Sequence, residues 1–330
     1  MGLLKGLVAN LVLVWLVFTG TFLMIWRLPG DPALVRCGER ASPETLANVR
    51  REFGLDRSAP ERYVRELTRL ACLDFGKSLR TRREVSRDLA EGWGATAELA
   101  LSAFALALVV GVPLGILAAH RRGSLIDLVL SQISLAGVSL PVYVLGLVLI
   151  LTLGQIPWLS FDGRLGAGIQ VPEGRTLLFW GSLACGDWDL ALNALSHLVL
   201  PALALSTIPT ALLMRMTRSA LVETLGEDFL RTARAKGAAE IRVVGWHALR
   251  AASAPIITAA GLQIGLLLGG AVLTESLFSW PGLGGYLVES LRSRDYPSIQ
   301  GVIVVGAVMV SLANLVADAL ASRLDPRLRP

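Results

Sequence analysis

The chain has 330 residues, of which 53% are hydrophobic and only 17% are charged. Its mean hydropathy of +0.59 excludes an ordinary soluble domain and indicates a protein that crosses a membrane several times. The net charge of +5 comes from basic residues spread over several loops rather than from one basic patch with interleaved aromatic residues, so we expect no nucleic-acid partner.

Six segments are long and apolar enough to cross a bilayer, for which a helix needs about 20 mainly apolar residues. They lie near residues 6–27, 95–119, 125–153, 191–214, 255–274 and 300–320. We therefore expect an all-α integral membrane protein with six transmembrane helices. The first segment exceeds the apolar core of a secretory signal peptide, and Pro29-Gly-Asp-Pro32 follows it instead of a small-residue cleavage site, so we expect it to be retained.

Residues 28–94 form the one long polar segment, and we expect them to fold as a small, mainly helical external domain after the first helix. Helices are expected near 43–53 and 60–73, and Ser42 before Pro43 is a strong helix-start signal. Stabilising the external face is favoured over direct substrate capture as the role of this domain. The expected divisions are 1–27 with the first transmembrane helix, 28–94, and a core of five transmembrane helices over 95–330.

The charges of the short loops predict the orientation of the chain. Loop 120–124 holds Arg121 and Arg122 without an acidic residue, and segment 215–254 holds seven basic against four acidic residues. Segment 155–190 holds two basic against four acidic residues. Because basic residues concentrate on the cytoplasmic side of a membrane, both termini and segment 215–254 are expected in the cytoplasm.

The three cysteines, Cys37, Cys72 and Cys185, are expected on the external side. In an oxidising space a Cys37–Cys72 disulfide and two free thiols are equally compatible with the sequence. Single cysteines without paired ligand spacing do not indicate a metal site. Cys185 follows an apolar run at 176–184 that is too short to cross a bilayer. A re-entrant segment, an interfacial segment and a segment packed on the external domain all stay open for this run.

No constellation of catalytic residues is evident. Gly76-Lys77-Ser78 resembles the end of a phosphate-binding loop, but Ala71 stands where the first glycine belongs and no strand is expected ahead of it. The expected spans hold almost no ionisable residues, and Glu98, Asp127 and Asp318 fall near span ends, where snorkelling or capping is the favoured interpretation. Transport coupled to protons would require ionisable residues deep inside the spans. Their scarcity fits instead a transport protein whose energy comes from a separate ATPase.

Proline and glycine interrupt several of the expected spans. Proline kinks a helix, and glycine at four-residue spacing lets neighbouring helices approach closely. Two interpretations stay open for the fifth span: its glycines, with a glutamine, line the translocation path or a partner contact, or they serve ordinary tight packing. The prolines are Pro113, Pro141, Pro201 and Pro209, and the candidate path residues are Gln263, Gly265 and Gly269.

Segment 228–255 is an amphipathic region between two apolar segments, and its first part is expected to be a helix. Thr224 and Glu227 have the spacing of a capping box ahead of that helix. Phe229 and Ala233 lie one turn apart, and Gly237 is placed to end the helix at its C′ position.

A second short helix is expected behind Gly237. Ile241, Val244 and Ala248 recur at helical spacing and predict one buried face. The two helices would form a helix–turn–helix at the membrane surface, with small residues where another protein comes close.

The run Arg231-Thr-Ala-Arg-Ala-Lys-Gly237, followed by His247-Ala-Leu-Arg250 and Pro255, resembles the cytoplasmic coupling loop of ABC-transporter permease subunits, in the version carried by dipeptide, oligopeptide and nickel importers. The sequence departs from the wider superfamily where Arg231-Thr232-Ala233 replaces a Glu-Ala-Ala triplet, so an essential acidic residue is not assumed there. Further blocks are similar to that family in its order, over nearly the whole chain: Pro29-Gly-Asp-Pro32, Phe53-Gly-Leu-Asp56, Arg121-Arg-Gly-Ser124, Phe278-Ser-Trp-Pro-Gly-Leu-Gly284, Arg294-Asp-Tyr-Pro297 and Leu324-Asp-Pro-Arg327.

The resemblance implies a type I ABC importer permease in the cell inner membrane. It implies as partners a second homologous permease, two ATPase subunits that bind ATP and Mg, and an extracytoplasmic solute-binding protein, with no cofactor or metal in this chain. Dipeptides or oligopeptides are favoured as cargo, with nickel and other small solutes as the alternative. A secondary transporter is disfavoured because an inverted repeat and intramembrane ionisable residues are not evident.

The resemblance also assigns coupling to segment 215–254. The helix pair would dock in a groove of an ATPase subunit, and closure of two ATPase subunits around ATP would move it. Small residues allow close approach, the glycine sets the turn, and basic residues supply charges at the rim. The residues expected to couple are Phe229, Arg231, Ala233, Arg234, Ala235, Lys236, Gly237, Ala238, His247 and Arg250.

Overall fold

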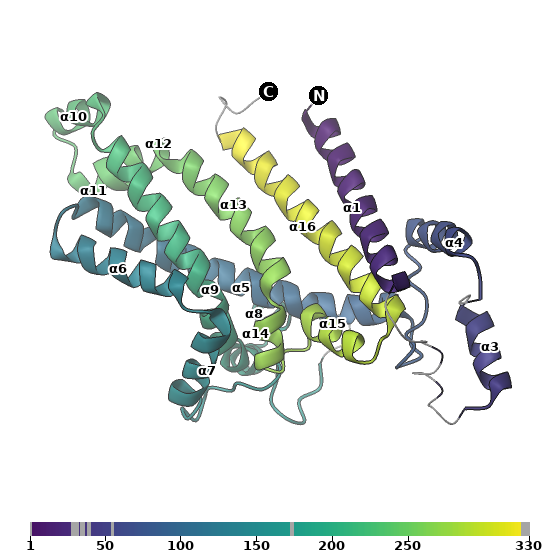
Figure 1. Ribbon diagram of the computed structural model, residues 1–330. Helices are drawn as coiled ribbons and strands as arrows, with labels where there is room; N and C mark the ends of the chain where they lie inside the picture. Colours follow the sequence, from purple (N-terminus) through teal and green to yellow (C-terminus); the bar gives the residue numbers. More distant parts are fainter. Residues whose placement is uncertain are drawn as a thin grey trace. The chain divides into compact units, whose positions relative to one another are not determined.

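The computed structural model describes residues 2–27, 33, 37, 41–53, 56–171 and 175–324, and within these ranges the regular structure is helical (Figure 1). The blocks Pro29-Gly-Asp-Pro32 and 325–327 lie outside the described residues. The elements are α1 (Gly2–Arg27), α3 (Pro43–Phe53), α4 (Ala59–Ala71), α5 (Val85–His120), α6 (Leu125–Ser139), α7 (Val142–Leu153), α8 (Leu178–Cys185), α9 (Trp188–Thr224), α10 (Asp228–Ala235), α11 (Glu240–Arg242), the π-helix η1 (Val243–Ala248), α12 (Leu249–Ala251), α13 (Ser253–Gly270), α14 (Val272–Leu277), α15 (Leu283–Arg292) and α16 (Tyr296–Leu324).

Four helices in the described part of the chain are long and apolar enough to cross a membrane. They comprise residues 8–27, 85–120, 188–224 and 296–316. Two further pairs of helices pass the same test together but are bent, by 105° between α6 and α7 and by 64° between residues 240–251 and 253–269. The described residues therefore hold four candidate spans, or the expected six if each bent pair counts as one span.

The expected interruption at Pro141 divides the segment 125–153 into two helices, α6 and α7. Leu140 ends α6 in an extended conformation (φ −82°, ψ 125°), and Pro141 stands at the N-cap of α7. Proline lacks an amide donor and disfavours a helical conformation in the residue before it, so the helix breaks at this point. By contrast, α9 continues through both Pro201 and Pro209.

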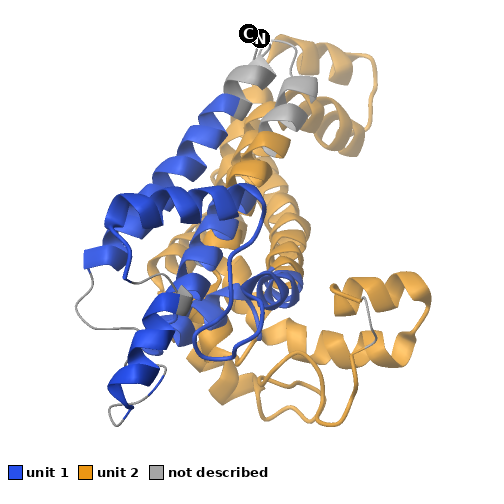
Figure 2. Ribbon diagram, turned by 90° about the vertical axis from the view of Figure 1, so that its right-hand side faces the viewer, with its two compact units in different colours: residues 1–96, 281–309 blue, residues 97–280, 310–330 orange. Residues whose placement is uncertain are grey.

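The chain folds as two compact units, which Figure 2 colours separately. One unit comprises residues 1–96 and 281–309, and the other comprises 97–280 and 310–330. In this division α15 and the first part of α16 group with the N-terminal residues, and the expected division at residues 27 and 94 stays a prediction. The expected domain boundary after residue 94 falls inside α5, which begins at Val85.

In the first unit, Asp295 fastens the segment that follows α4. Its buried carboxylate accepts hydrogen bonds from the Ser78 hydroxyl and, at 3.0 Å, from the Leu79 amide. Ser78, in the triplet Gly76-Lys77-Ser78 that resembles the end of a phosphate-binding loop, thus makes a structural hydrogen bond to Asp295. Nearby, the buried side chains of Val85, Leu89, Leu283 and Val302 form an apolar cluster.

The two helices expected in segment 28–94 form close to where the sequence predicts them, as α3 and α4. The Thr45 amide donates a hydrogen bond of 3.2 Å to the Ser42 hydroxyl, which confirms Ser42 as the cap of α3. Tyr63 of α4 packs against Phe18 and Phe22 of α1, with ring centroids 5.6 and 5.3 Å apart. The structure has Cys37, Cys72 and Cys185 as free thiols, so the disulfide alternative is not realised in it.

In the second unit, α9 is the central helix and packs against α6, α7, α8 and α13. The short run at 176–184 forms α8, with Leu178 and Ser182 buried. It packs against α9 of the same unit, and the choice among the three interpretations of this run stays open. Trp180 adds a hydrogen bond of 3.0 Å from its indole nitrogen to the Ser102 hydroxyl on α5.

Candidate functional site

The first helix of segment 215–254, α10, is anchored by one side chain. Leu230 is fully buried, whereas Phe229 beside it is 47% exposed. The expected capping box is wrong: Glu227 is the N-cap residue and makes no side-chain cap bond, and the Thr224 hydroxyl donates instead to the Ala220 carbonyl at 2.8 Å. Thr224 belongs to the last turn of α9, where a threonine hydroxyl can bond to the carbonyl four residues earlier.

Gly237 ends α10 as the sequence predicts. Its φ of +80° lies in the left-handed region, and nothing lies within 4 Å of the position that a Cβ would take. The Gly237 amide donates to the Arg234 carbonyl at 2.9 Å, and the Ala238 amide donates to the Ala233 carbonyl at 3.2 Å. These two bonds form a Schellman motif, which explains the need for glycine here.

The second part of the segment differs from the expected α-helix. A π-helix, η1, lies between the short turns α11 and α12, and Ile241 is 85% exposed instead of buried. Val243 and Ala248 are fully buried, and Val244 is buried as expected. Bonding between residues i and i+5 widens the turn, so residues 243 and 248 share the buried face.

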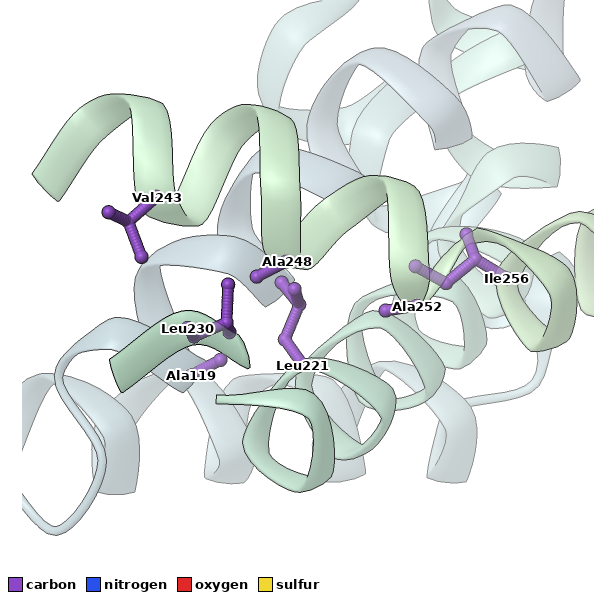
Figure 3. Close-up of a cluster of buried hydrophobic side chains, with 7 residues drawn as sticks. All are labelled: Ala119, Leu221, Leu230, Val243, Ala248, Ala252 and Ile256. Atoms are coloured by element: carbon purple, nitrogen blue, oxygen red, sulfur yellow. The ribbon is translucent and has the colours of Figure 1, made fainter. Parts of the chain in front are cut away.

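A buried apolar cluster ties this segment to three long helices. Leu230 and Val243 of the segment pack with side chains of α5, α9 and α13. Figure 3 shows Leu221 and Leu230 beneath the turn that carries Ala248. The cluster consists of Ala119, Leu221, Leu230, Val243, Ala248, Ala252 and Ile256. Burying a large aliphatic side chain contributes about 1.5–3 kcal/mol. The segment therefore shares one close-packed apolar core with α5, α9 and α13.

The outer surface of the segment carries exposed apolar groups among cations. Phe229 is 47%, Trp246 62% and Ile241 85% exposed, and the Arg250 guanidinium lies 5.9 Å from the Trp246 ring centroid. Exposed aromatic side chains with arginine are typical of protein–protein interfaces. Of the expected coupling residues, Ala233 and Ala238 are half-buried, and the exposed ones are Phe229, Arg231, Arg234, Ala235, Lys236, Gly237, His247 and Arg250.

Arg234 forms an ion pair that joins α10 to α11 across the turn between them. Its guanidinium donates to the Glu240 carboxylate at 3.1 and 3.2 Å, across the turn at Gly237. Next to Glu240, an apolar groove of about 390 Å³ runs between α5 and η1, lined by Ile116, Leu117, Ile241 and Val244 among others. The segment thus presents exposed apolar side chains and, next to them, an apolar groove.

The candidate path residues do not share one environment. Gln263 is buried, and a Cβ on Gly265 would lie 2.8 Å from the Asn314 side-chain oxygen. Gly269 has nothing within 4 Å of its Cβ position. The arrangement accounts for Gly265 by tight packing, and the role of these residues in a path stays a prediction.

Close helix contact occurs at glycines that the sequence analysis did not select. A Cβ on Gly111 would lie 2.7 Å from the Thr210 carbonyl oxygen, and one on Gly115 would lie 2.6 Å from the Met214 carbonyl oxygen. Both glycines are on α5, and α9 approaches them with its backbone. Their four-residue spacing is the signal that could have identified this contact.

Two carboxylates expected at span ends are partners in ion pairs. Asp127 accepts from the Gly123 amide at 3.0 Å, as a capping group does, and pairs with Arg218. Glu98 does not snorkel, because it is 1% exposed and pairs with Arg164. Its carboxylate also accepts from the Phe179 amide in the first turn of α8, as a capping group does. The side chain of Asp318 lies outside the described residues.

Comparisons with known proteins decide the family of the chain. Residues 111–330 match the model of the binding-protein-dependent transport system inner membrane component, and residues 2–100 match the model of its N-terminal region. The chain belongs to this family. It is a permease subunit of an ABC importer.

Similar proteins are found along almost the full length of the permease. It is 40% identical over 315 residues to the dipeptide transport system permease protein DppB of Escherichia coli K12, covering 94% of this chain and 93% of that protein. It is 42% identical over 311 residues to the di/tripeptide transport system permease protein DppB of Pseudomonas aeruginosa, with the same coverage. A structure of the inward-facing MetNI methionine ABC transporter shares the fold, with a TM-score of 0.51 at 17% identity, covering 72% of this chain and 96% of that one.

Proposed function

We propose that this permease, together with a second permease subunit, forms the translocation path of an ATP-driven importer of dipeptides and short oligopeptides. The relatives named above, at about 40% identity over nearly the whole chain, support this cargo. ABC importer permeases in general work with a second permease, ATPase subunits and a binding protein. The distribution of basic residues supports cytoplasmic termini.

The observation that supports this proposal most is that segment 215–254 combines an exposed apolar surface with a buried cluster beneath it. The exposed side chains of Phe229 and Trp246, with Arg250 beside Trp246, support docking of segment 215–254 on an ATPase subunit. The cluster around Leu230 then transmits the motion of the docked segment to α5, α9 and α13. In this proposal ATP hydrolysis takes place on the partner subunit, and this chain supplies the packed contacts that pass the movement on to its helices.

The first prediction tests docking. Phe229→Ala with Trp246→Ala should lower co-purification of the ATPase subunit about tenfold or more, because two exposed aromatic anchors of an interface are lost. Uptake of a labelled dipeptide in cells that lack the native permease should fall in parallel. Trp158→Ala is the control, since Trp158 is 60% exposed and lies in the expected external segment. Unchanged co-purification in the double variant would argue against this docking surface.

The second prediction tests the turn. Gly237→Val should lower substrate-stimulated ATP hydrolysis by the reconstituted importer several-fold, because a side chain at φ +80° costs about 1–2 kcal/mol and distorts the joint between α10 and α11. Gly237→Asn should couple nearly normally, since asparagine tolerates the left-handed conformation. Normal coupling in the valine variant would contradict the proposed role of the turn.

A further inference from the structure

A cavity of about 510 Å³ lies in the first unit, far along the sequence from segment 215–254. Its walls come from α1, α4, residues 74–79 and the start of α16. Phe18, Leu79 and Val304 supply apolar surface, and α1 and α16 are two of the helices that are long and apolar enough to span a membrane. Neither the coupling surface nor the transport proposal uses this cavity.

The charged side chains of the cavity are predominantly cationic. Four basic and two acidic side chains line it. Arg62 pairs with Glu66 at 2.7 Å, and Arg69 pairs with Asp74 at 2.9 Å. The Arg69 guanidinium and the Gly76 amide hold the pKa of Asp74 below its ordinary value, so this carboxylate is charged and its partner is neutralised.

Two cations are left without an acidic partner. Arg65 and Lys77 are exposed and form no ion pair with any other described residue. They project from two different walls of the cavity, α4 and the 74–79 segment. A group that satisfies both must carry negative charge.

Two hydrogen-bonding groups in the walls also lack a partner. The Tyr296 hydroxyl and the Gln300 amide nitrogen are buried atoms, and neither has a hydrogen-bond partner within the described part of the chain. Both residues line the cavity on α16. An unsatisfied buried donor costs about 1–3 kcal/mol, and an acceptor oxygen in the cavity would relieve that cost once these side chains turn toward it.

Together these groups define the chemistry of an occupant. It should carry several acceptor oxygens and a negative charge for Arg65, Lys77, Tyr296 and Gln300, and it should have an apolar part for Phe18 and its neighbours. Basic side chains beside a membrane span attract anionic lipid headgroups. A phospholipid combines the two requirements, because its phosphate and its acyl chains are attached to the same glycerol backbone.

We propose that this cavity binds the phosphate group of an anionic phospholipid, with the acyl chains lying along α1 and α16. The site is independent of the proposed cargo and of the ATPase. Its occupation would hold α4 and the 74–79 segment against the two helices by a charge-assisted contact.

Native mass spectrometry of the assembled importer tests this, with phosphatidylglycerol, phosphatidylcholine and inorganic phosphate as probes. Wild-type importer should retain phosphatidylglycerol in preference to phosphatidylcholine. Arg65→Gln with Lys77→Gln should weaken phosphatidylglycerol retention at least about tenfold, since each basic group contributes to lipid attraction. Arg51→Gln with Arg57→Gln removes the same charge from exposed positions away from the cavity and should retain the lipid.

A second pair of variants separates binding from folding. Tyr296→Phe with Gln300→Leu removes the unsatisfied donors, so lipid retention should fall while the unfolding temperature is maintained or rises. Equal retention in the Arg65/Lys77 variant, or equal retention of both lipids by the wild type, would overturn the proposal. If excess inorganic phosphate displaces the lipid and binds alone, the occupant is free phosphate and the lipid assignment is wrong.

Discussion

Glu98→Gln is expected to lower the free energy of unfolding of the permease by about 3–5 kcal/mol, the cost of breaking a buried ion pair by removing one partner. Glu98 is 1% exposed, and its carboxylate accepts from the Arg164 guanidinium and from the Phe179 amide. Arg164 also donates to the Thr176 carbonyl at 2.9 Å and lies 5.6 Å from the Trp280 ring centroid. The substitution would leave Arg164 as an uncompensated charge among these groups.

Thermal unfolding of the purified protein, followed by intrinsic fluorescence, measures this effect. Glu98→Gln combined with Arg164→Met should recover part of the lost stability, because both charges are then absent. Glu223→Gln is the matched control, since Glu223 is exposed on α9. An unfolding temperature for Glu98→Gln equal to that of this control would show that the pair contributes nothing to stability.

Gly115→Val is expected to prevent assembly of the folded second unit, or to destabilise it by more than about 3 kcal/mol. A Cβ at this position would lie 2.6 Å from both the Met214 carbonyl oxygen and the Thr217 Cβ. The first of these atoms belongs to the α9 backbone, so no side-chain rotation relieves the overlap and the two helices must separate. Ala119 and Leu221, further along the same two helices, belong to the cluster beneath segment 215–254.

The yield of monodisperse protein after size-exclusion chromatography, together with its unfolding temperature, checks this prediction. Gly306→Val is the control, because Gly306 lies on the apolar helix α16 and nothing lies within 4 Å of its Cβ position. Both glycines therefore receive the same side chain in a long apolar helix. Near-normal yield and stability of Gly115→Val would mean that the α5–α9 contact is not required.

Several features could be predicted because they depend on neighbours in the sequence. The start of α3 at Pro43 follows from its serine cap, and the end of α10 follows from the backbone freedom of Gly237. The break at Pro141 was also visible as a proline in an apolar segment. The direction and size of the resulting 105° bend were not, because they depend on how α7 packs.

Other features required the folded chain. Helical periodicity placed Ile241 inside, whereas the π-helix η1 turns it outward and buries Val243. Glu98 meets a partner 66 residues away, and Asp295 meets the amide of Leu79 216 residues away. No local spacing encodes such a pairing, so a carboxylate near a span end gives no indication of its partner.

The sequence by itself determined the membrane class, the approximate spans, the helices α3 and α4 and the amphipathic segment, because hydropathy and turn chemistry act over a few residues. The tertiary structure alone decided which carboxylates are buried, which glycines admit another backbone, and how the surface segment is joined to α5, α9 and α13. These depend on close packing between distant segments, where one methyl group or one charge changes the free energy by several kcal/mol.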